Sequence, residues 1–468
     1  MVSWGRLTEK HMPRLYTPSV QAFFEQLWKA RGARYLRDYI ANGAYGALPP
    51  GDSYAPDLPI KFVRSAELTP NLGIDLDACP QVAIEYFIPK ARARKDDILL
   101  AVKGATIASK KSVAHVREDI GDAIVNGSIF RMQAKEGVNP RLLAIALSSE
   151  FAKRQMKLGL VANNGVDYLD KTLIHKIVVP LPELNKQNEL VHQYDDSAAN
   201  AELQYRQADA LLASIDDHLL AELGITLPQE PDNTLGKRMF RAKASDLGGW
   251  RFDPLFHSFK LWHAIEESQT PSSHLGRFCR LAKTGFAAGG NMQLHDDDGI
   301  VQIRPTNIGS DRQLKFDRNV YLDRGILHTQ PTDVLQRREV LFNNTNSQEQ
   351  VGKTAFFEIE GEFVCSNHIT RIATNEAELL PEYLTNVLNA YQRLKVFYSI
   401  CTNWNNQSGV NVDLLRKLII PVPSVRKQQA IAEEISGIYE QANALRRQAA
   451  DELERAKTNI EAILLRDS

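Results

Sequence analysis

Apolar and polar residues alternate over short runs in two separate parts of the chain, and each part ends in a long segment with a different period. In the first part the runs "IKFVRSAEL" (60–68), "DILLAV" (97–102) and "AIVNGSIFRM" (123–132) lie among Gly, Asn and Asp residues. This pattern is typical of strands and loops. Shorter helices are predicted at about 140–158 and 381–400, each followed by an apolar run that ends in Pro-x-Pro. The early parts therefore predict mixed α/β heads.

The segments after each Pro-x-Pro carry one narrow apolar stripe with a mean spacing of 3.5 residues. Such a seam predicts coiled-coil helices, and at 1.5 Å per residue a helix of about 40 residues spans roughly 60 Å. The simplest partner for each stripe is the other helix of the same chain, and Gly224 is a plausible stop for the first helix. The first seam is Tyr194, Ala198, Ala201, Tyr205, Ala208, Leu212, Ile215 and Leu219; the second is Ile435, Ile438, Ala442, Leu445, Ala449, Leu453, Ala456, Ile460 and Ile463.

The chain repeats itself at an offset of 240–242 residues. "VVPLPELNKQ" (178–187) returns as "IIPVPSVRKQ" (419–428), and "IKFVRSAEL" falls on "IVQIRPTNI" (300–308). "GDAIVNGSIFRM" (121–132) falls on "GEFVCSNHITRI" (361–372), which pairs Arg131 with Arg371. "PRLLAIAL" (140–147) falls on "PEYLTNVL" (381–388). Four ordered matches at a nearly constant offset predict a tandem duplication.

Composition leaves room for several domains in 468 residues and excludes few functions. The net charge of −1 does not by itself indicate a nucleic-acid-binding protein. A chain with balanced charges can still have a basic face that binds nucleic acid. Four scattered cysteines, without a C-x-x-C pair or His at zinc spacing, predict reduced thiols and no metal. No apolar run reaches the length of a membrane span, and the start lacks a signal-peptide core, so we expect no membrane contact and a cytoplasmic location.

Catalytic motifs of the common types are not found. "SQEQVGKT" (347–354) ends like a phosphate-binding loop, but Ser347 replaces the required first glycine, so we expect no nucleotide site. The acidic runs at 296–298 and at Asp96-Asp97 are interpreted as solvated turns. The sequence therefore predicts a chain without catalytic residues and without a cofactor of its own.

Polar and basic loops are what remain for recognition, because Asn can bond adenine edges while Lys and Arg bond guanine or phosphate. An aromatic side chain among amides could pack on a sugar or a base. Taken singly, such clusters are as often turns and solubilising charges as they are sites. The predicted DNA-contacting residues are Arg64, Lys103, Lys110, Lys111, Asn126, Arg304, Asn307, Asn343, Asn344, Asn346, Lys353, Asn367, His368, Trp404 and Asn405.

These features together resemble one family, the specificity subunits of type I restriction–modification systems. "VPLPELNKQ" and "PVPSVRKQQ" are similar to the P-x-P-x-x-x-x-Q junction between each target-recognition domain and its long helix. "VKGATI" (102–107), "VLFNNTNSQEQVGKTAFF" (340–357) and "SGVNVDLLRKLIIPVP" (408–423) resemble other segments of the family. Two departures stand out. Lys186 and Lys427 replace the usual acid before the junction Gln, and Ala108 stands where a Gly often follows "GATI".

The resemblance implies an α+β fold made of two target-recognition domains, 1–180 and 225–421, with long helices at 181–224 and 422–468 that form an antiparallel coiled coil. It implies a non-catalytic subunit that reads a bipartite target in double-stranded DNA. The partners implied are methyltransferase subunits, expected to number two, that methylate adenine, and restriction subunits that translocate DNA. S-adenosylmethionine, ATP and magnesium would be held by those partners.

Two alternatives stay open at this stage. The chain could serve a fused methyltransferase–nuclease of another restriction type, which uses a similar subunit. It could also be a coiled-coil adaptor that never contacts DNA, since long paired helices with globular ends suit a scaffold as well.

Overall fold

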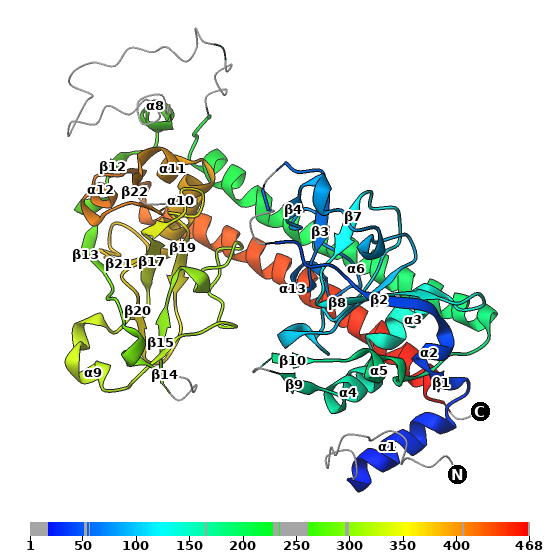
Figure 1. Cartoon of the computed structure of the whole chain (residues 1–468). Helices are drawn as coiled ribbons and strands as arrows, with labels where there is room; N and C mark the ends of the chain where they lie inside the picture. The colour runs from blue at the N-terminus through cyan, green and yellow to red at the C-terminus, as the bar shows by residue number, and fades with distance from the viewer. Residues whose placement is uncertain are drawn as a thin grey trace. The chain divides into compact units, whose positions relative to one another are not determined.

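The computed structural model of the chain describes residues 17–50, 54–55, 57–163, 166–227, 234, 261–294, 299–404 and 407–466 (Figure 1). The chain divides into two compact units: unit 1 is Met1–Arg206 with Leu445–Ser468, and unit 2 is Gln207–Ala444. Each unit holds one head and parts of both long helices. Among the described residues, no helix is long and apolar enough to cross a bilayer.

The head of unit 1 is built from short strands and helices. Its helices are α1 (Pro18–Lys29), α2 (Leu36–Tyr39), α3 (Pro140–Leu147), α4 (Glu150–Leu158) and α5 (Lys171–His175). Its strands are β1 (Ala33–Tyr35), β2 (Ile40–Tyr45), β3 (Ile60–Val63), β4 (Gln81–Val82), β5 (Ile98–Ala101), β6 (Val113–His115), β7 (Ala123–Val125), β8 (Ile129–Ala134), β9 (Val161–Asn163), β10 (Val166–Tyr168) and β11 (Val178–Pro180).

A four-stranded antiparallel sheet, in the order β2-β8-β5-β6, is the centre of this head. Strand β5 is buried along its whole length, and its residues face two cores in turn. Ile98 and Leu100 pack with helices α3 and α4, whereas Leu99 and Ala101 pack with residues of β3 and β7. A continuous apolar run is what a strand covered on both faces requires.

The head of unit 2 has the same kind of elements. Its helices are α8 (Leu261–Glu267), α9 (Ile326–Thr329), α10 (Pro381–Arg393), α11 (Val396–Ile400) and α12 (Val412–Arg416). Its strands are β12 (Ser272–His274), β13 (Cys279–Thr284), β14 (Gln293–Leu294), β15 (Ile300–Ile303), β16 (Tyr321–Leu322), β17 (Glu339–Asn343), β18 (Thr345–Asn346), β19 (Thr354–Phe357), β20 (Phe363–Cys365), β21 (Ile369–Thr374), β22 (Thr402–Trp404), β23 (Gln407–Gly409) and β24 (Ile419–Pro421).

The topology of unit 2 repeats that of unit 1. The central sheet β13-β21-β17-β19 matches β2-β8-β5-β6, and the parallel pair β15–β20 matches β3–β7. The antiparallel pair β12–β24 matches β1–β11. Strands β11 and β24 both end at the first proline of a Pro-x-Pro sequence. The duplicated α/β architecture predicted from the sequence is therefore present in the fold.

Two long helices, α6 (Leu184–Glu222) and α13 (Val425–Leu464), pack against each other within each unit. In unit 1, Ala201 of α6 is buried with Ala449 and Leu453 of α13. In unit 2, Ile215 of α6 shares a core with Ile435 of α13. Residues later in α6 pack against residues earlier in α13, so the two helices are antiparallel.

Local sequence explains where the helices begin and end. Asn139 caps α3 by accepting the N–H groups of Arg141 and Leu142, and Asn411 caps α12 through Leu414. Gly224, with φ of 64°, follows α6 as the predicted stop. The predicted helix at 140–158 is interrupted at 148–149, and the one at 381–400 is interrupted near Lys395, whose φ of 60° is left-handed.

Candidate nucleic-acid interface

A small three-stranded sheet, β18-β23-β22, presents the aromatic candidate of unit 2. Asn346 pairs with Ser408 across this sheet, and Trp404 pairs with Gln407. The Trp404 side chain is 45% exposed, and its indole lies over Gly409, where a Cβ would stand 2.3 Å from the ring. Because only glycine leaves room for the ring, the backbone here holds an exposed indole beside amide side chains.

A loop at 366–368 lies against the same sheet. The Asn344 N–H donates to the carbonyl of His368 over 2.9 Å, which joins this loop to the residue just before β18. Asn367 is exposed and His368 is half-buried. We call Asn346, Asn367, His368 and Trp404 the amide–aromatic surface of unit 2. The candidate Asn405 lies outside the described residues.

Three other candidate amides of unit 2 are inside the head. Asn307 is 1% exposed, and its side chain accepts the Arg304 N–H and donates to the carbonyl of Lys315. Asn343 donates to the carbonyl of Gln350, and Asn344 donates to the Thr370 hydroxyl over 2.9 Å. These amides shape the loops from within and present no hydrogen-bonding edge to a partner.

The Gly-Lys-Thr sequence at 352–354 leads into a strand, whereas a phosphate-binding loop leads into a helix. The Thr354 hydroxyl donates to the carbonyl of Gly352 over 2.9 Å and is buried. Gly352 has φ of 93° and lies against the ring of Phe397. Lys353 is half-buried, and burial lowers the pKa of its amine. Gly352 therefore allows close packing against Phe397, and the segment resembles a phosphate-binding loop in sequence but not in structure.

The lysines of unit 1 that the sequence predicts to contact DNA are on its surface. Lys103, Lys110 and Lys111 are exposed, and the backbone of Lys103 bridges to Tyr168 of the β9–β10 hairpin. Lys457 of α13 donates to the carbonyl of Pro70 over 2.8 Å. Burial, together with the charges of Lys153 and Lys110, lowers the pKa of Lys457 to about 8.

We call Lys103, Lys110, Lys111 and Lys457 the basic surface of unit 1. A lysine whose ammonium is disfavoured by neighbouring positive charge is stabilised by an approaching anion such as a phosphate. Sequence reasoning missed Lys457, because nothing in the helical pattern of 425–464 says that this lysine meets the loop at Pro70.

The remaining candidates lie near the ends of the parallel strands. Arg64 follows β3, and its Nε lies 3.2 Å from the carboxylate of the buried Glu67. Arg304 follows β15, and its Nη2 donates to Gln302 over 2.9 Å. Asn126 accepts the Ser128 N–H and so closes a turn. The two arginines occupy equivalent positions in the repeat and keep part of their guanidinium groups exposed.

The glutamine of each junction has a structural role that sequence reasoning did not assign. Gln187 is buried; it accepts the Asn139 N–H and donates to the carbonyl of Pro182. Gln428 is buried in the same way, accepting the Leu380 N–H and donating to the carbonyl of Pro423. Each amide thereby ties the start of a long helix to the start of a head helix. The repeated Gln at a fixed distance from Pro-x-Pro was the available signal.

The two junction lysines behave differently. Lys186 makes an exposed ion pair with Glu189 one turn along α6, at 2.7 Å. Lys427 makes an ion pair across the helices, with the carboxylate of Glu222 on α6. The base that replaces the usual acid therefore links the helices of unit 2, whereas it is a local surface pair in unit 1.

The interpretation of Asp96-Asp97 as a solvated turn is wrong for Asp97. Its side chain is fully buried and accepts hydrogen bonds from Arg131 at 3.1 and 3.2 Å. Arg371 makes the equivalent pair with the buried Glu339 in unit 2. A buried arginine needs a buried acid, so the matched Arg131 and Arg371 already implied two acidic partners. The acidic run at 296–298 lies outside the described residues.

Comparison with known proteins finds a family similarity in residues 306–455. A family model described as "type I restriction modification DNA specificity domain" matches residues 306–455. A putative type I restriction enzyme MjaX specificity subunit from Methanocaldococcus jannaschii is 31% identical over 99 residues, which cover 21% of this chain and 23% of that protein. The match therefore spans about a quarter of the relative's length.

Three solved structures are distantly similar over most of the chain. One comes from work on complex assembly and conformational transition of the type I R-M system; it has 16% identity and a TM-score of 0.46, and the match covers 92% of this chain and 96% of that one. The HsdS subunit from Thermoanaerobacter tengcongensis has 15% identity, coverages of 92% and 95%, and a TM-score of 0.33. The S subunit from M. genitalium has 11%, coverages of 93% and 96%, and 0.39.

The matched residues 306–455 include the amide–aromatic surface, the second junction and much of α13. They coincide with the segments "VLFNNTNSQEQVGKTAFF" and "SGVNVDLLRKLIIPVP" that carry the family resemblance. Residues 306–455 are therefore similar to a type I restriction modification DNA specificity domain, the kind of domain that the motifs of this chain resemble.

Proposed function

We propose that this chain is the DNA sequence-specificity subunit of a type I restriction–modification complex. Each head reads one half of a bipartite target in double-stranded DNA. The chain itself is non-catalytic and recruits two methyltransferase subunits, which bring S-adenosylmethionine and methylate adenine. It also recruits restriction subunits, which bring ATP and magnesium.

The observation that carries this proposal is the duplicated head with a different polar surface in each copy. The family match falls on the copy that carries Trp404 and its neighbouring amides. Indole and amide groups can stack on bases and bond their edges, while lysines bind phosphates without reading sequence. Two heads of one fold with unlike surfaces suit a target made of two unlike halves.

Methylation mapping tests the proposal directly. DNA from cells with and without this gene is sequenced for methylated adenine. We expect one split motif, with two specified parts and a gap, to lose methylation in the deletion strain and to regain it on complementation. An unchanged methylation map would contradict the proposal.

The long helices are proposed to set the gap between the two half-sites. Four residues inserted near the end of one long helix add slightly more than one turn and lengthen the helix by about 6 Å, and local unwinding of the coiled coil accommodates the resulting stutter in the seam. We expect the unspecified gap in the motif to lengthen by about two base pairs, since base pairs repeat every 3.4 Å along the duplex. A complex that methylates the original spacing would exclude this ruler mechanism.

Two alternatives are separated by further observations. A coiled-coil adaptor would not shift a DNA fragment in a gel even with the methyltransferase bound, whereas the proposed subunit shifts fragments that carry the mapped motif. A specificity subunit for a fused methyltransferase–nuclease would purify with one large partner instead of separate methyltransferase and restriction subunits.

A further inference from the structure

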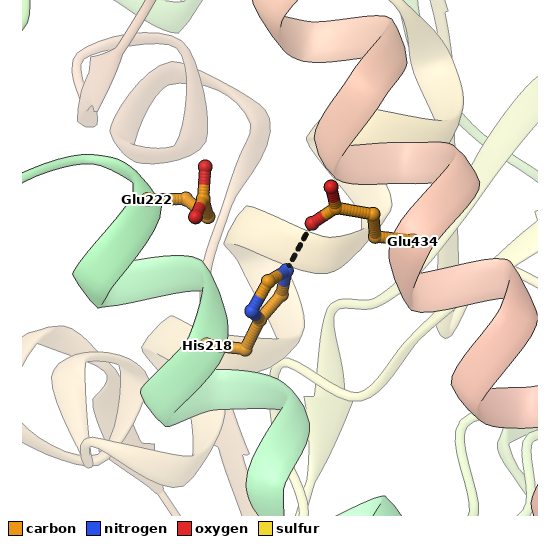
Figure 2. Close-up of side chains that lie close together, drawn as sticks. All are labelled: His218, Glu222 and Glu434. Carbon is orange, nitrogen blue, oxygen red and sulfur yellow. Dashed lines mark ion pairs between the residues drawn. The ribbon is translucent and has the colours of Figure 1, made fainter.

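Three metal-ligating side chains meet between α6 and α13 within unit 2 (Figure 2). His218 and Glu222 lie one helical turn apart on α6, and Glu434 faces them from α13. One ligand atom from each residue lies within 4.8 Å of the other two. The Nε2 of His218 is 2.8 Å from the carboxylate of Glu434. The three donors, from two helices, are therefore close enough together to be candidate ligands of one ion.

The Nε2 atom of His218, which faces the carboxylates, lacks a hydrogen-bond partner among the described residues. Within the described part of the chain, Nε2 of His218 is shielded from solvent and makes no well-aligned hydrogen bond, despite the short distance to Glu434. Donor atoms bound to one tetrahedral zinc ion, each about 2.0–2.2 Å from it, lie roughly 3.4 Å apart, so the two donors need to separate by only about 0.6 Å to hold the ion. The spacing of these two donors is thus close to that of two ligands on one metal.

The choice of donors selects a class of ion. Imidazole favours zinc and its neighbours among the transition metals, whereas magnesium and calcium take oxygen ligands. We propose that His218, Glu222 and Glu434 bind one divalent transition-metal ion of the zinc class, with water as the fourth ligand, and that the ion clips α6 to α13 within unit 2. This revises the expectation of no metal site, which rested on cysteine motifs and zinc-type histidine spacing.

Lys427 competes with the ion. Its ammonium makes an ion pair with the carboxylate of Glu222, so it occupies part of the cation's place when the ion is absent. A bound metal displaces this ammonium from Glu222. Lys427 should thus lower the affinity for the ion, which an acid at this position would not do.

The first unit has no counterpart of this cluster. At the offset of about 241 residues that relates the two junctions, the positions of His218, Glu222 and Glu434 correspond to Asn459, Ile463 and Gln193. The duplication alone therefore does not produce the three ligands. The three ligands occur in unit 2 alone among these matched positions, and the apolar seam between the helices does not require them.

Calorimetric titration of the full chain with zinc chloride, after treatment with a chelator, tests the site. We expect one site in the wild type and a dissociation constant at least about tenfold weaker in His218→Ala and in Glu434→Gln, since even outer-shell changes weaken metal sites by 10–100-fold. Glu434→Gln keeps the size of an exposed side chain and so preserves the fold. His192→Ala, which removes an exposed histidine elsewhere on α6, serves as the control and should bind as the wild type does.

Lys427→Ala gives a second, opposite readout. Removing the competing ammonium should tighten zinc binding, while the matched Lys186→Ala at the first junction should leave it unchanged. Cobalt(II) in place of zinc should give visible absorption bands in the wild type that disappear in His218→Ala. If His218→Ala and Glu434→Gln bind zinc as tightly as the wild type, the assignment is overturned.

Discussion

The two heads of this chain have one frame and two surfaces. Their central sheets, parallel strand pairs and junction glutamines correspond position by position. Their buried ion pairs also correspond, although unit 1 uses Asp97 where unit 2 uses the longer Glu339. The exposed candidates in the described residues differ: unit 1 has lysines, whereas unit 2 has amides and an indole.

This contrast separates two kinds of constraint. Buried groups must be paired or closely packed, so both copies retain the same solution. Exposed loop residues carry no such requirement and are free to differ. A duplicated reader can thereby acquire two different half-sites without rebuilding its frame.

The largest test of this comparison removes the buried arginines one at a time. Arg131→Met and Arg371→Met each leave a buried carboxylate without its partner, which should destabilise the affected unit by about 3–5 kcal/mol. Hydrogen exchange followed by mass spectrometry should show lost protection in β5 and β8 for the first variant and in β17 and β21 for the second.

Arg206→Met is the matched control, because it breaks an exposed pair with Glu202 and should change stability by less than about 1 kcal/mol. Equal loss of protection in both units from a single arginine variant would show that the heads are not separate frames.

The second largest expected effect is a difference between the two units in how acid changes their stability. Burial, with the nearby charge of Arg141, lowers the pKa of His115 to about 4, and Asp96 offsets this only in part. His115 lies opposite Ile98, and Phe356 takes the matching place opposite Val340 in unit 2. Unit 1 therefore contains a buried imidazole where unit 2 contains a phenyl ring.

The sign follows from proton binding. Below pH 6.5 the unfolded imidazole takes up a proton, while the folded one stays neutral until about pH 4. The free energy of unfolding of unit 1 therefore keeps its full value above pH 6.5, where the imidazole is neutral in both states, and it decreases as the pH falls towards 4. Between pH 7 and pH 5 unit 1 should lose about 2 kcal/mol relative to unit 2.

Urea titrations at the two pH values, with each unit followed by pulsed hydrogen exchange at one labelling pH, measure the difference. His115→Phe, which introduces the residue of unit 2, should remove it. A pH effect that survives this substitution would assign the acid sensitivity to other groups.

DNA binding offers the third contrast, and it depends on the proposed function. Trp404→Ala should weaken binding of the mapped motif by about tenfold, because an aromatic stack is worth about 1–3 kcal/mol, and the dependence on salt should stay the same. Lys110→Ala should weaken binding to all sequences and reduce the slope of affinity against salt by about one counterion.

Fluorescence titrations of the complex with the methyltransferase, at several salt concentrations, distinguish the two effects. A salt slope that changes for Trp404→Ala and not for Lys110→Ala would reverse the roles given to the two surfaces.

The sequence was a good guide to the frame and a poor guide to which loop side chains are exposed. The seam spacing of 3.5, the alternation in strands and the offset near 241 all report local chemistry, and local chemistry dictates helices, strands and the repeat. Whether Asn343 turns inward or Asn367 outward depends on residues far along the chain. The same limit hid Asp97, whose partner is Arg131, and Glu434, which meets His218 from another helix.

The smallest contrast concerns Ala108 of unit 1 and Lys395 of unit 2, two of the non-glycine residues that have a left-handed backbone conformation. Ala108 has φ of 54° and is buried, whereas Lys395 has φ of 60° and is exposed. A side chain there costs about 1–2 kcal/mol, and glycine removes this strain but loses about 0.5–1 kcal/mol through chain entropy. Lys395→Gly should therefore stabilise unit 2 by about 0.5 kcal/mol.

Ala108→Gly should have almost no net effect, because it also removes a buried methyl worth about 0.8 kcal/mol. Introducing the glycine that the family often has at this position would thus gain nothing in this chain. Gly104→Ala is the control for conformation alone: it has φ of 74°, and a Cβ added there meets no described atom within 4 Å, so it should destabilise unit 1 by about 1 kcal/mol. Differential scanning calorimetry of the three variants checks the order Lys395→Gly, Ala108→Gly, Gly104→Ala from most to least stable. An Ala108→Gly variant as stabilised as Lys395→Gly would mean that the Ala108 methyl contributes no packing energy, and that burial does not explain why alanine occupies a glycine position.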